Sequence, residues 1–281
     1  INYEGLATTA GSFALNNNMS KNAFVVDKLK ENGALILGKT NLSEWAYYFC
    51  NNCPSGYSAL GGQTLNPYGR KIFDSGGSSS GSGAAISANF SSVSLGSETS
   101  GSILSPSSAN SIVGLKPTIG QVSRSGIVPI SSTLDTSGPM TKNVIDNAIV
   151  LKAVSGFDEN DFMSVNSEDI DLESIVNSSL KGKRFGVFNE FLNDSLYLSA
   201  VNKIEKLGGT IIKFNPPQIN FDGFRKILDY DMKNDLPIYF KNNNISFKSV
   251  KDIIEFNKED LIKRAPYGQG IFKSIQSDST K

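Results

Sequence analysis

The most informative absence in this chain of 281 residues is histidine, which does not occur at all. Imidazole is the base of Ser-His-Asp triads and Cys-His dyads, and it is a ligand at most catalytic zinc sites. The chain therefore lacks the residue on which these site types depend. Any hydrolytic reaction that it carries out must take its base from lysine, a carboxylate or water.

Cysteine is almost as scarce, with two residues, Cys50 and Cys53, separated by two asparagines. Structural zinc needs four nitrogen or sulfur ligands, and the sequence has no other cysteine to add. A thioredoxin-like pair would be followed by a helix, whereas Pro54, Ser55 and Gly56 follow here. We interpret the pair as part of a loop, leave a disulfide open, and expect neither a metal nor a cofactor.

The chain also lacks a charge excess, because lysine plus arginine and aspartate plus glutamate both number 27. Binding to a phosphate backbone depends on a basic field, so nucleic acid is not expected as a partner. Apolar runs of membrane-spanning length and a signal peptide are also missing from the sequence. We expect no membrane contact and a cytoplasmic location, with secretion as the alternative, and a homodimer stays open.

Hydrophobic spacing predicts alternating helices and strands, which is typical of an α/β fold. An amphipathic pattern predicts a helix over residues 144–154. Residues 184–188, 195–207 and 210–214 are interpreted as strand, helix and strand, an order that indicates parallel pairing. Ala34–Leu37 is expected to be a buried strand.

Two further expectations concern helices. Asn41 is expected to cap a helix that runs through Glu44, Trp45 and Phe49. The sequence from Phe221 onward has a helical pattern, which we expect Pro237 to break.

Serine and glycine are concentrated between Ser75 and Ser111, where 16 of 37 residues are serine and six are glycine. Flexible linkers have a similar composition, but here apolar residues are interleaved with the serines. Small side chains at residues 84–88 are suited to a closely packed helix, and residues 93–95 to a short strand. The segment is therefore interpreted as part of the fold.

Within this segment, Gly101 precedes Ser102 and leaves the backbone open to close approach by a substrate carbonyl. Successive amide N–H groups over residues 99–102 could converge on an oxyanion, which such donors stabilise by about 3 kcal/mol each. An ordinary Ser/Gly turn is the alternative interpretation of the same residues.

Longer motifs bear on this alternative. The sequence has Gly-Gly-Ser-Ser at residues 76–79, Glu-Thr-Ser-Gly-Ser-Ile at 98–103 and Gly-Leu-Lys-Pro-Thr at 114–118. In these motifs it resembles the amidase-signature family of serine hydrolases. Further family-like blocks follow in family order at residues 8–12, 38–46, 61–68, 122–130 and 135–140. The resemblance is dense over residues 1–158 and thinner beyond them.

The resemblance implies an amidase-signature fold, with a mixed, mostly parallel central sheet covered by helices on both faces. It implies one domain over residues 1–281, made of a signature core at 1–158 and a peripheral part at 159–281. No metal or cofactor belongs to this family pattern.

The resemblance also assigns roles. Ser102 would be the nucleophile, and Ser78, after a cis peptide bond at Gly77, would relay the proton. Ser79 would support the network from behind. The oxyanion hole would be formed by the amides of Thr99, Ser100, Gly101 and Ser102.

The family base is a lysine in a K-D-N-I-N string, and Ile1-Asn2 matches the end of that string. We therefore expect the catalytic lysine just upstream of Ile1, and a chain that is incomplete at both ends. Lys39 and Lys116 are the substitutes within the sequence, but both lie in structural motifs of the family.

Leu104 stands where many family members have an arginine that can bind a substrate carboxylate. A neutral or peptide-like amide is therefore expected as substrate, and Glu98 with its neighbouring motifs resembles the peptide-amidase branch. We expect an amidase that acts on C-terminal peptide amides or simple neutral amides. The alternatives are the A subunit of a Glu-tRNA(Gln) amidotransferase and a catalytically dead family member.

Overall fold

The computed structural model describes residues 1–167 and 169–277. The chain divides into two compact units, one made of Ile1–Ile170 with Phe224–Lys281 and the other of Asp171–Gly223. The expected boundary near residue 158 does not separate them, because the last helices of the chain belong with its first 170 residues. A single domain over the whole chain stays a prediction.

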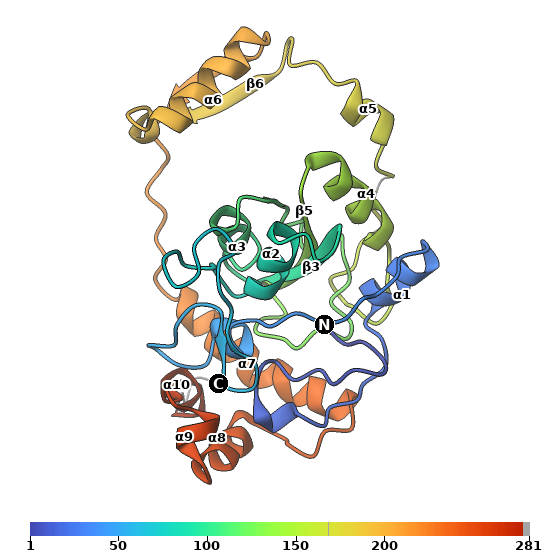
Figure 1. Ribbon diagram of the computed structural model, residues 1–281, viewed down its shortest axis with the longest axis vertical. Helices are drawn as coiled ribbons and strands as arrows, with labels where there is room; N and C mark the ends of the chain where they lie inside the picture. The colour runs from blue at the N-terminus through green and yellow to red at the C-terminus, as the bar shows by residue number, and fades with distance from the viewer. Residues whose placement is uncertain (168, 278–281) are drawn as a thin grey trace. The chain divides into compact units, whose positions relative to one another are not determined.

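The larger unit is built around a three-stranded sheet with the order β3-β5-β4 (Figure 1). Strand β5 (Thr136–Thr141) lies in the middle and is antiparallel to both β3 (Val93–Glu98) and β4 (Val113–Gly114). Every residue of β5 is buried, so both faces of the sheet are covered.

The expectation of a mostly parallel sheet is wrong for the described residues. A parallel pair needs a crossover that returns the chain to the same end of the sheet. Between β3 and β5 the chain instead runs through α3 (Leu104–Ala109), β4 and a loop, and it enters β5 in the opposite direction. A second pair, β1 (Tyr57–Ser58) and β2 (Gly62–Gln63), is also antiparallel.

Parallel pairing occurs where the strand-helix-strand pattern predicted it, in the smaller unit. There β6 (Arg184–Phe188) pairs in parallel with β7 (Thr210–Phe214), and α6 (Ser195–Lys206) connects them. The Asp194 carboxylate caps this helix by accepting from the Tyr197 N–H. The parallel pairing predicted from the local pattern is therefore confirmed, whereas the mostly parallel main sheet was implied only by the resemblance.

Three helices pack against the main sheet: α2 (Ser80–Ser87), α3 (Leu104–Ala109) and α4 (Val144–Val154). The last confirms the helix predicted over residues 144–154. Small residues predominate in helix α2 because its backbone lies close to the segment at Asn41. A methyl group on Gly81 would lie only 2.3 Å from the Asn41 carbonyl oxygen.

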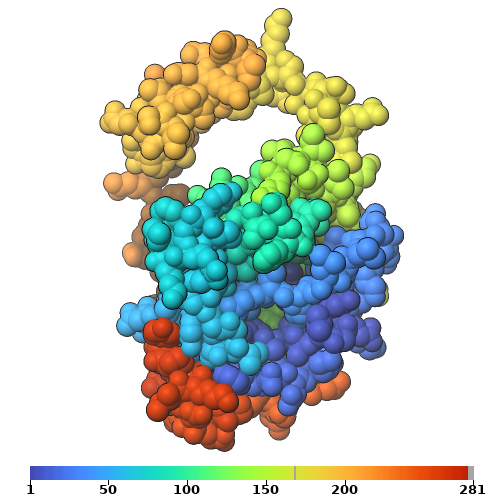
Figure 2. Space-filling model, in the orientation of Figure 1, coloured from blue at the N-terminus to red at the C-terminus, as the bar shows by residue number. Residues whose placement is uncertain are grey.

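A separate hydrophobic core joins the two ends of the larger unit. Helices α7 (Phe224–Asn242), α8 (Val250–Lys258) and α10 (Gly270–Ser277) enclose aromatic residues from the first 50 positions. The ring centroids of Trp45 and Phe272 are 5.3 Å apart. In the space-filling view, residues of the C-terminal helices lie directly against N-terminal chain (Figure 2).

Three local expectations are wrong. Ala34–Leu37 forms no strand, and its Leu35 and Leu37 are 89% and 76% exposed, because none of the described strands pairs with this segment. Pro237 does not break its helix, since α7 runs through it.

The third concerns residues 44–49. Only a short 3-10 turn, Glu44–Tyr47, forms there, and Trp45, Ala46 and Tyr47 have φ values of 51°, 55° and 71° in the left-handed region. The Asn41 side chain does not cap this turn, because its Oδ1 accepts from the Ser58 hydroxyl at 2.7 Å and Ser43 stands at the cap position.

Cys50 and Cys53 are paired as a disulfide. None of the helices in the described part of the chain is long and apolar enough to cross a membrane. The remaining helical elements are η1 (Phe13–Leu15), α1 (Phe24–Glu31), α5 (Leu172–Val176), η3 (Asn189–Phe191) and α9 (Leu261–Arg264).

Candidate active site

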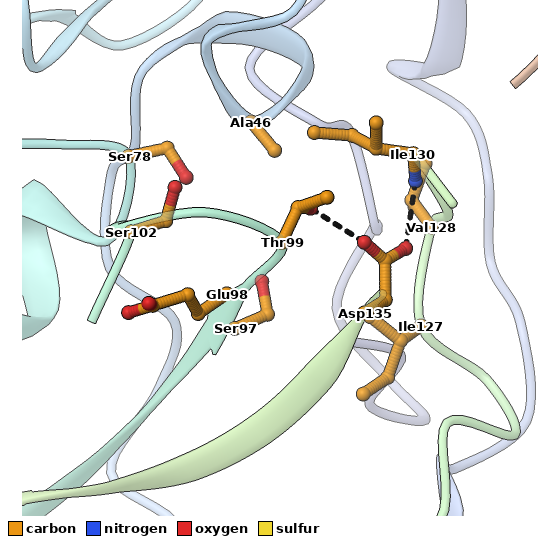
Figure 3. Close-up of a pocket in the computed structure, with 10 residues that line it drawn as sticks. All are labelled: Ala46, Ser78, Ser97, Glu98, Thr99, Ser102, Ile127, Val128, Ile130 and Asp135. Atoms are coloured by element: carbon orange, nitrogen blue, oxygen red, sulfur yellow. Dashed lines mark hydrogen bonds between the residues drawn. The ribbon is translucent and has the colours of Figure 1, made fainter. Parts of the chain in front are cut away.

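The structure brings the two serine-rich motifs together beside the end of β3. Ser78 lies two residues before α2, and Ser102 lies in the connection between β3 and α3; both side chains are buried. The Ser79 N–H donates to the Ser102 carbonyl oxygen at 3.1 Å and joins the two segments. Figure 3 shows the hydroxyl groups of Ser78 and Ser102 pointing toward one another.

The backbone before Ser78 leaves no room for side chains. The Gly77–Ser78 peptide bond is cis, as the resemblance implied. A methyl group on Gly77 would lie 2.6 Å from the Ser43 Oγ, and one on Gly76 would lie 2.5 Å from the Pro106 Cα. The Ser43 N–H also donates to the Ser78 carbonyl oxygen at 3.0 Å. Two glycines at these positions therefore allow the Ser78 hydroxyl to approach that of Ser102.

The loop around Ser102 is held by a buried carboxylate that the sequence analysis had used only as a marker of the family branch. Glu98 Oε1 accepts from the Gly101 N–H at 2.7 Å. Its Oε2 accepts from the N–H groups of Ile103 at 2.6 Å and Leu104 at 3.0 Å. Three main-chain donors thus satisfy the buried acceptor, and the loop is fixed from within.

The four predicted oxyanion donors are not equivalent in this geometry. The Gly101 N–H is already donated to Glu98. Among the described residues, no acceptor is bonded to the amides of Thr99, Ser100 or Ser102. These three N–H groups are therefore the ones that remain for a developing negative charge.

Ser78 and Ser102 face a pocket whose lining comes from four parts of the chain (Figure 3). Ala46 reaches it from the left-handed turn, and Ile127, Val128 and Ile130 form an apolar wall from the loop before β5. The other lining residues are Ser97, Glu98, Thr99 and Asp135.

Asp135 is a second buried carboxylate that lines the pocket, and no pattern in the sequence indicated its contacts. Its Oδ1 accepts from the Thr99 hydroxyl at 2.5 Å, and its Oδ2 accepts from the N–H groups of Ile130 at 2.8 Å and Ser131 at 2.9 Å. Burial raises the pKa of Asp135 to about 6. The family-like block at 135–140 marked this position, but no local pattern predicts its bond to Thr99.

Two other residues singled out in the sequence, Ser79 and Leu104, do not line the pocket. The Ser79 hydroxyl donates to the Ser97 carbonyl oxygen and accepts from the Ser97 N–H, both at 3.1 Å, so it contacts β3. Leu104 is the first residue of α3, is 47% exposed and does not line the pocket. In the part of the chain that the structure describes, none of the lining residues is basic.

Neither substitute lysine lines the pocket. Lys39 donates through Nζ to the Ala7 carbonyl oxygen at 3.0 Å and to the Thr8 Oγ1 at 2.6 Å, and burial lowers its pKa to about 8. Within residues 1–167 and 169–277, three or more histidine, cysteine, aspartate or glutamate side chains are nowhere placed to hold a metal ion.

Comparisons with known proteins identify relatives along nearly the whole chain. A profile of the family described as Amidase matches residues 1–263. A probable amidase of Arabidopsis thaliana is 38% identical over 98% of this chain and 56% of its own length. The A subunit of the glutamyl-tRNA(Gln) amidotransferase of Dehalococcoides mccartyi is 40% identical over 74% of this chain and 42% of its own length.

Solved structures give the same result. The native peptide amidase of Stenotrophomonas maltophilia superposes with a TM-score of 0.92 at 37% identity, covering 99% of this chain and 60% of that one. An amidase family protein of Bacillus anthracis superposes with a TM-score of 0.93 at 38% identity, covering 100% and 58%. The chain thus spans about half the length of the curated relatives it matches.

Proposed function

Because the chain belongs to the amidase family, we propose that the protein hydrolyses the C–N bond of carboxamides, with C-terminal peptide amides or simple neutral amides as its substrates. The observation that carries the proposal is the meeting of the Ser78 and Ser102 hydroxyls beside the unbonded amides of Thr99, Ser100 and Ser102. A nucleophile next to such donors is what acyl transfer requires.

In the proposed reaction, Ser102 Oγ forms a bond to the amide carbon while its proton passes to Ser78. Ser78 transfers its own proton to a lysine, which is the base in this proposal. We take this to be the lysine of the K-D-N-I-N string, placed ahead of Ile1 by the match at Ile1-Asn2. A neutral lysine can act in this way because burial disfavours its charged form.

Collapse of the tetrahedral intermediate breaks the C–N bond, and the proton returns along the same path to the leaving nitrogen. Ammonia or an amine departs and leaves an ester at Ser102. Water then attacks this ester, releases the carboxylic acid and restores the serine hydroxyl. The N–H groups of Thr99, Ser100 and Ser102 would stabilise the oxyanion in both halves of the reaction.

Two observations support neutral or peptide amides as the substrate class. No basic residue lines the described pocket, so a free carboxylate on the substrate would find no cation there. The similarity to a peptide amidase over 99% of the chain also supports a peptide amide as the substrate. The proposed reaction needs only the amide and water as reactants. A cytoplasmic location and a homodimer stay predictions.

A second candidate is the A subunit of a Glu-tRNA(Gln) amidotransferase, favoured by 40% identity to such a protein over 74% of the chain. That function would require partner subunits. Co-purification of partners, together with glutamine as the sole amide hydrolysed, would support this candidate over a free-standing amidase.

The test measures ammonia release by the full-length protein from a C-terminal peptide amide, a simple neutral amide, malonamate and glutamine. We expect the two neutral amides to react faster than malonamate. Ser102→Ala should lower kcat by about 10⁴-fold or more without changing the melting temperature. Ser108→Ala, an exposed serine of α3, is the matched control and should be as active as the wild type. Unchanged turnover in Ser102→Ala would refute the nucleophile assignment.

A further inference from the structure

Thr99 is the only one of the remaining oxyanion donors whose side chain is held by a charged group among the described residues. It directly follows β3, which ends at Glu98, and its hydroxyl donates to Asp135 Oδ1 at 2.5 Å. Figure 3 shows this bond at the pocket wall opposite Ser78. The Thr99 side chain is therefore fixed in one orientation close to its own amide.

Asp135 is itself immobilised. Its second oxygen accepts the N–H groups of Ile130 and Ser131, and its side chain is buried at the start of β5. With three donors on two oxygens, the carboxylate is satisfied by protein groups, and it is not left over to bind a substrate amine. A group of this kind acts on the reaction by holding other residues in place.

The two buried carboxylates of the site hold opposite ends of the loop. Glu98 accepts from Gly101, Ile103 and Leu104, which come after Thr99 and Ser100 in the loop and lie on either side of Ser102. It makes no bond to the amide of Thr99 or Ser100. Without another anchor, the first part of the loop would be fixed only by the end of β3.

We propose that Asp135 is a positioning residue for the hydrolysis: through the Thr99 hydroxyl it fixes the Thr99 amide where the oxyanion forms. This inference rests on the proposed function and adds a residue to it. The amide must stand about 3 Å from the oxyanion, and a displacement of about 1 Å can cost two orders of magnitude in rate. The same carboxylate joins the oxyanion loop to the apolar wall at Ile130.

The experiment compares Thr99→Val, Thr99→Ser and Asp135→Asn in the full-length protein with a neutral peptide amide. Valine keeps the shape of threonine but lacks the hydroxyl. We expect Thr99→Val to lower kcat by about 10- to 100-fold with KM within about threefold of the wild type. Thr99→Ser keeps the hydroxyl and should restore kcat to within about threefold. This rescue separates the hydroxyl bond from the loss of packing.

A double-mutant cycle tests whether the two residues act together. If Asp135 works through Thr99, then Thr99→Val combined with Asp135→Asn should be no slower than the slower single variant. Thr141→Val is the matched control, because it removes a buried hydroxyl bond to the Asn143 carbonyl oxygen at the other end of β5. It should lower the melting temperature and leave kcat unchanged.

The outcomes are distinguishable. If Thr99→Val left turnover unchanged while Ser102→Ala abolished it, this inference alone would be overturned. It would also be overturned if Thr99→Ser were as slow as Thr99→Val. Fully additive losses in the cycle would show that Asp135 does not act through Thr99. If Ser102→Ala were as active as the wild type, the proposed function would fail first, and the inference with it.

Discussion

At the scale of single residues, Asp135 makes the stability of the protein depend on pH in the direction opposite to a salt-bridged carboxylate. Burial raises its pKa from the ordinary value of 3.8 to about 6, although nearby Arg124 opposes the shift. In the unfolded chain the carboxyl ionises at the lower pH, so the unfolded state binds fewer protons between about pH 4 and 6. The contribution of Asp135 is therefore full below pH 4 and is lost as pH rises through 6.

Asp135→Asn removes this ionisation and should remove the pH dependence that belongs to it. Between pH 4 and 7 we expect the free energy of unfolding of the wild type to fall relative to the variant by up to roughly 3 kcal/mol. Urea unfolding at four pH values measures the difference. Glu255→Gln, which removes an exposed carboxylate of α8, serves as the control. Parallel curves for wild type and Asp135→Asn would contradict the prediction.

At the same scale, the sequence identifies Ser78 and Ser102 as candidates because motifs of contiguous residues mark them. Asp135 and Thr99 are 36 positions apart, and their contact depends on how β5 pairs with β3. The spacing of hydrophobic residues does not predict that these two strands pair. The expected pocket residue Leu104 illustrates the same limit, since only the structure shows its side chain outside the pocket.

At the scale of elements, the proline inside α7 is expected to lower stability. Proline lacks the N–H that a helix interior needs and costs about 3 kcal/mol relative to alanine there, partly offset by the stiffer unfolded chain. Pro237→Ala should therefore raise the free energy of unfolding by about 1 to 2 kcal/mol, measured by chemical denaturation. Pro216→Ala, in a segment without regular structure, should give no gain. A loss of stability in Pro237→Ala would show that the ring packs better than alanine.

Element by element, the sequence predicts what local patterns determine. The helix at Val144–Val154 and the strand-helix-strand passage of the smaller unit are confirmed, since each depends on neighbouring residues and a side-chain cap. The prediction of a strand at Ala34–Leu37 is wrong, because an apolar run becomes a strand only when another strand pairs with it. The left-handed turn at Trp45–Tyr47 has no local signal, as none of its residues is glycine.

At the scale of the whole larger unit, its C-terminal helices stabilise the segment around Trp45, which reaches the pocket through Ala46. Trp45 is the single tryptophan of the chain, is buried, and packs against Phe272 of α10 and lies next to Ala46 of the pocket. Phe272→Ala should lower the free energy of unfolding by about 3 to 5 kcal/mol, since Phe272 is fully buried. It should also shift the Trp45 fluorescence to longer wavelength.

Phe90→Ala, which truncates a phenylalanine that is mostly exposed, is the control and should change neither quantity. An unshifted emission spectrum in Phe272→Ala would show that the core closes around Trp45 without the ring. Because the lone tryptophan reports on this packing, the same spectrum can be followed during unfolding.

The carboxylate of Asp135 in the pocket also bears on how the proposed turnover would finish. The proposed hydrolysis would convert an uncharged amide into an anionic acid in the pocket that Asp135 lines, and Asp135 is ionised above about pH 6. Like charges in a poorly solvated cavity repel, so the acid would be held more weakly than the amide from which it came. The residue proposed to position the Thr99 amide would in this way also favour release of the product and keep product inhibition weak.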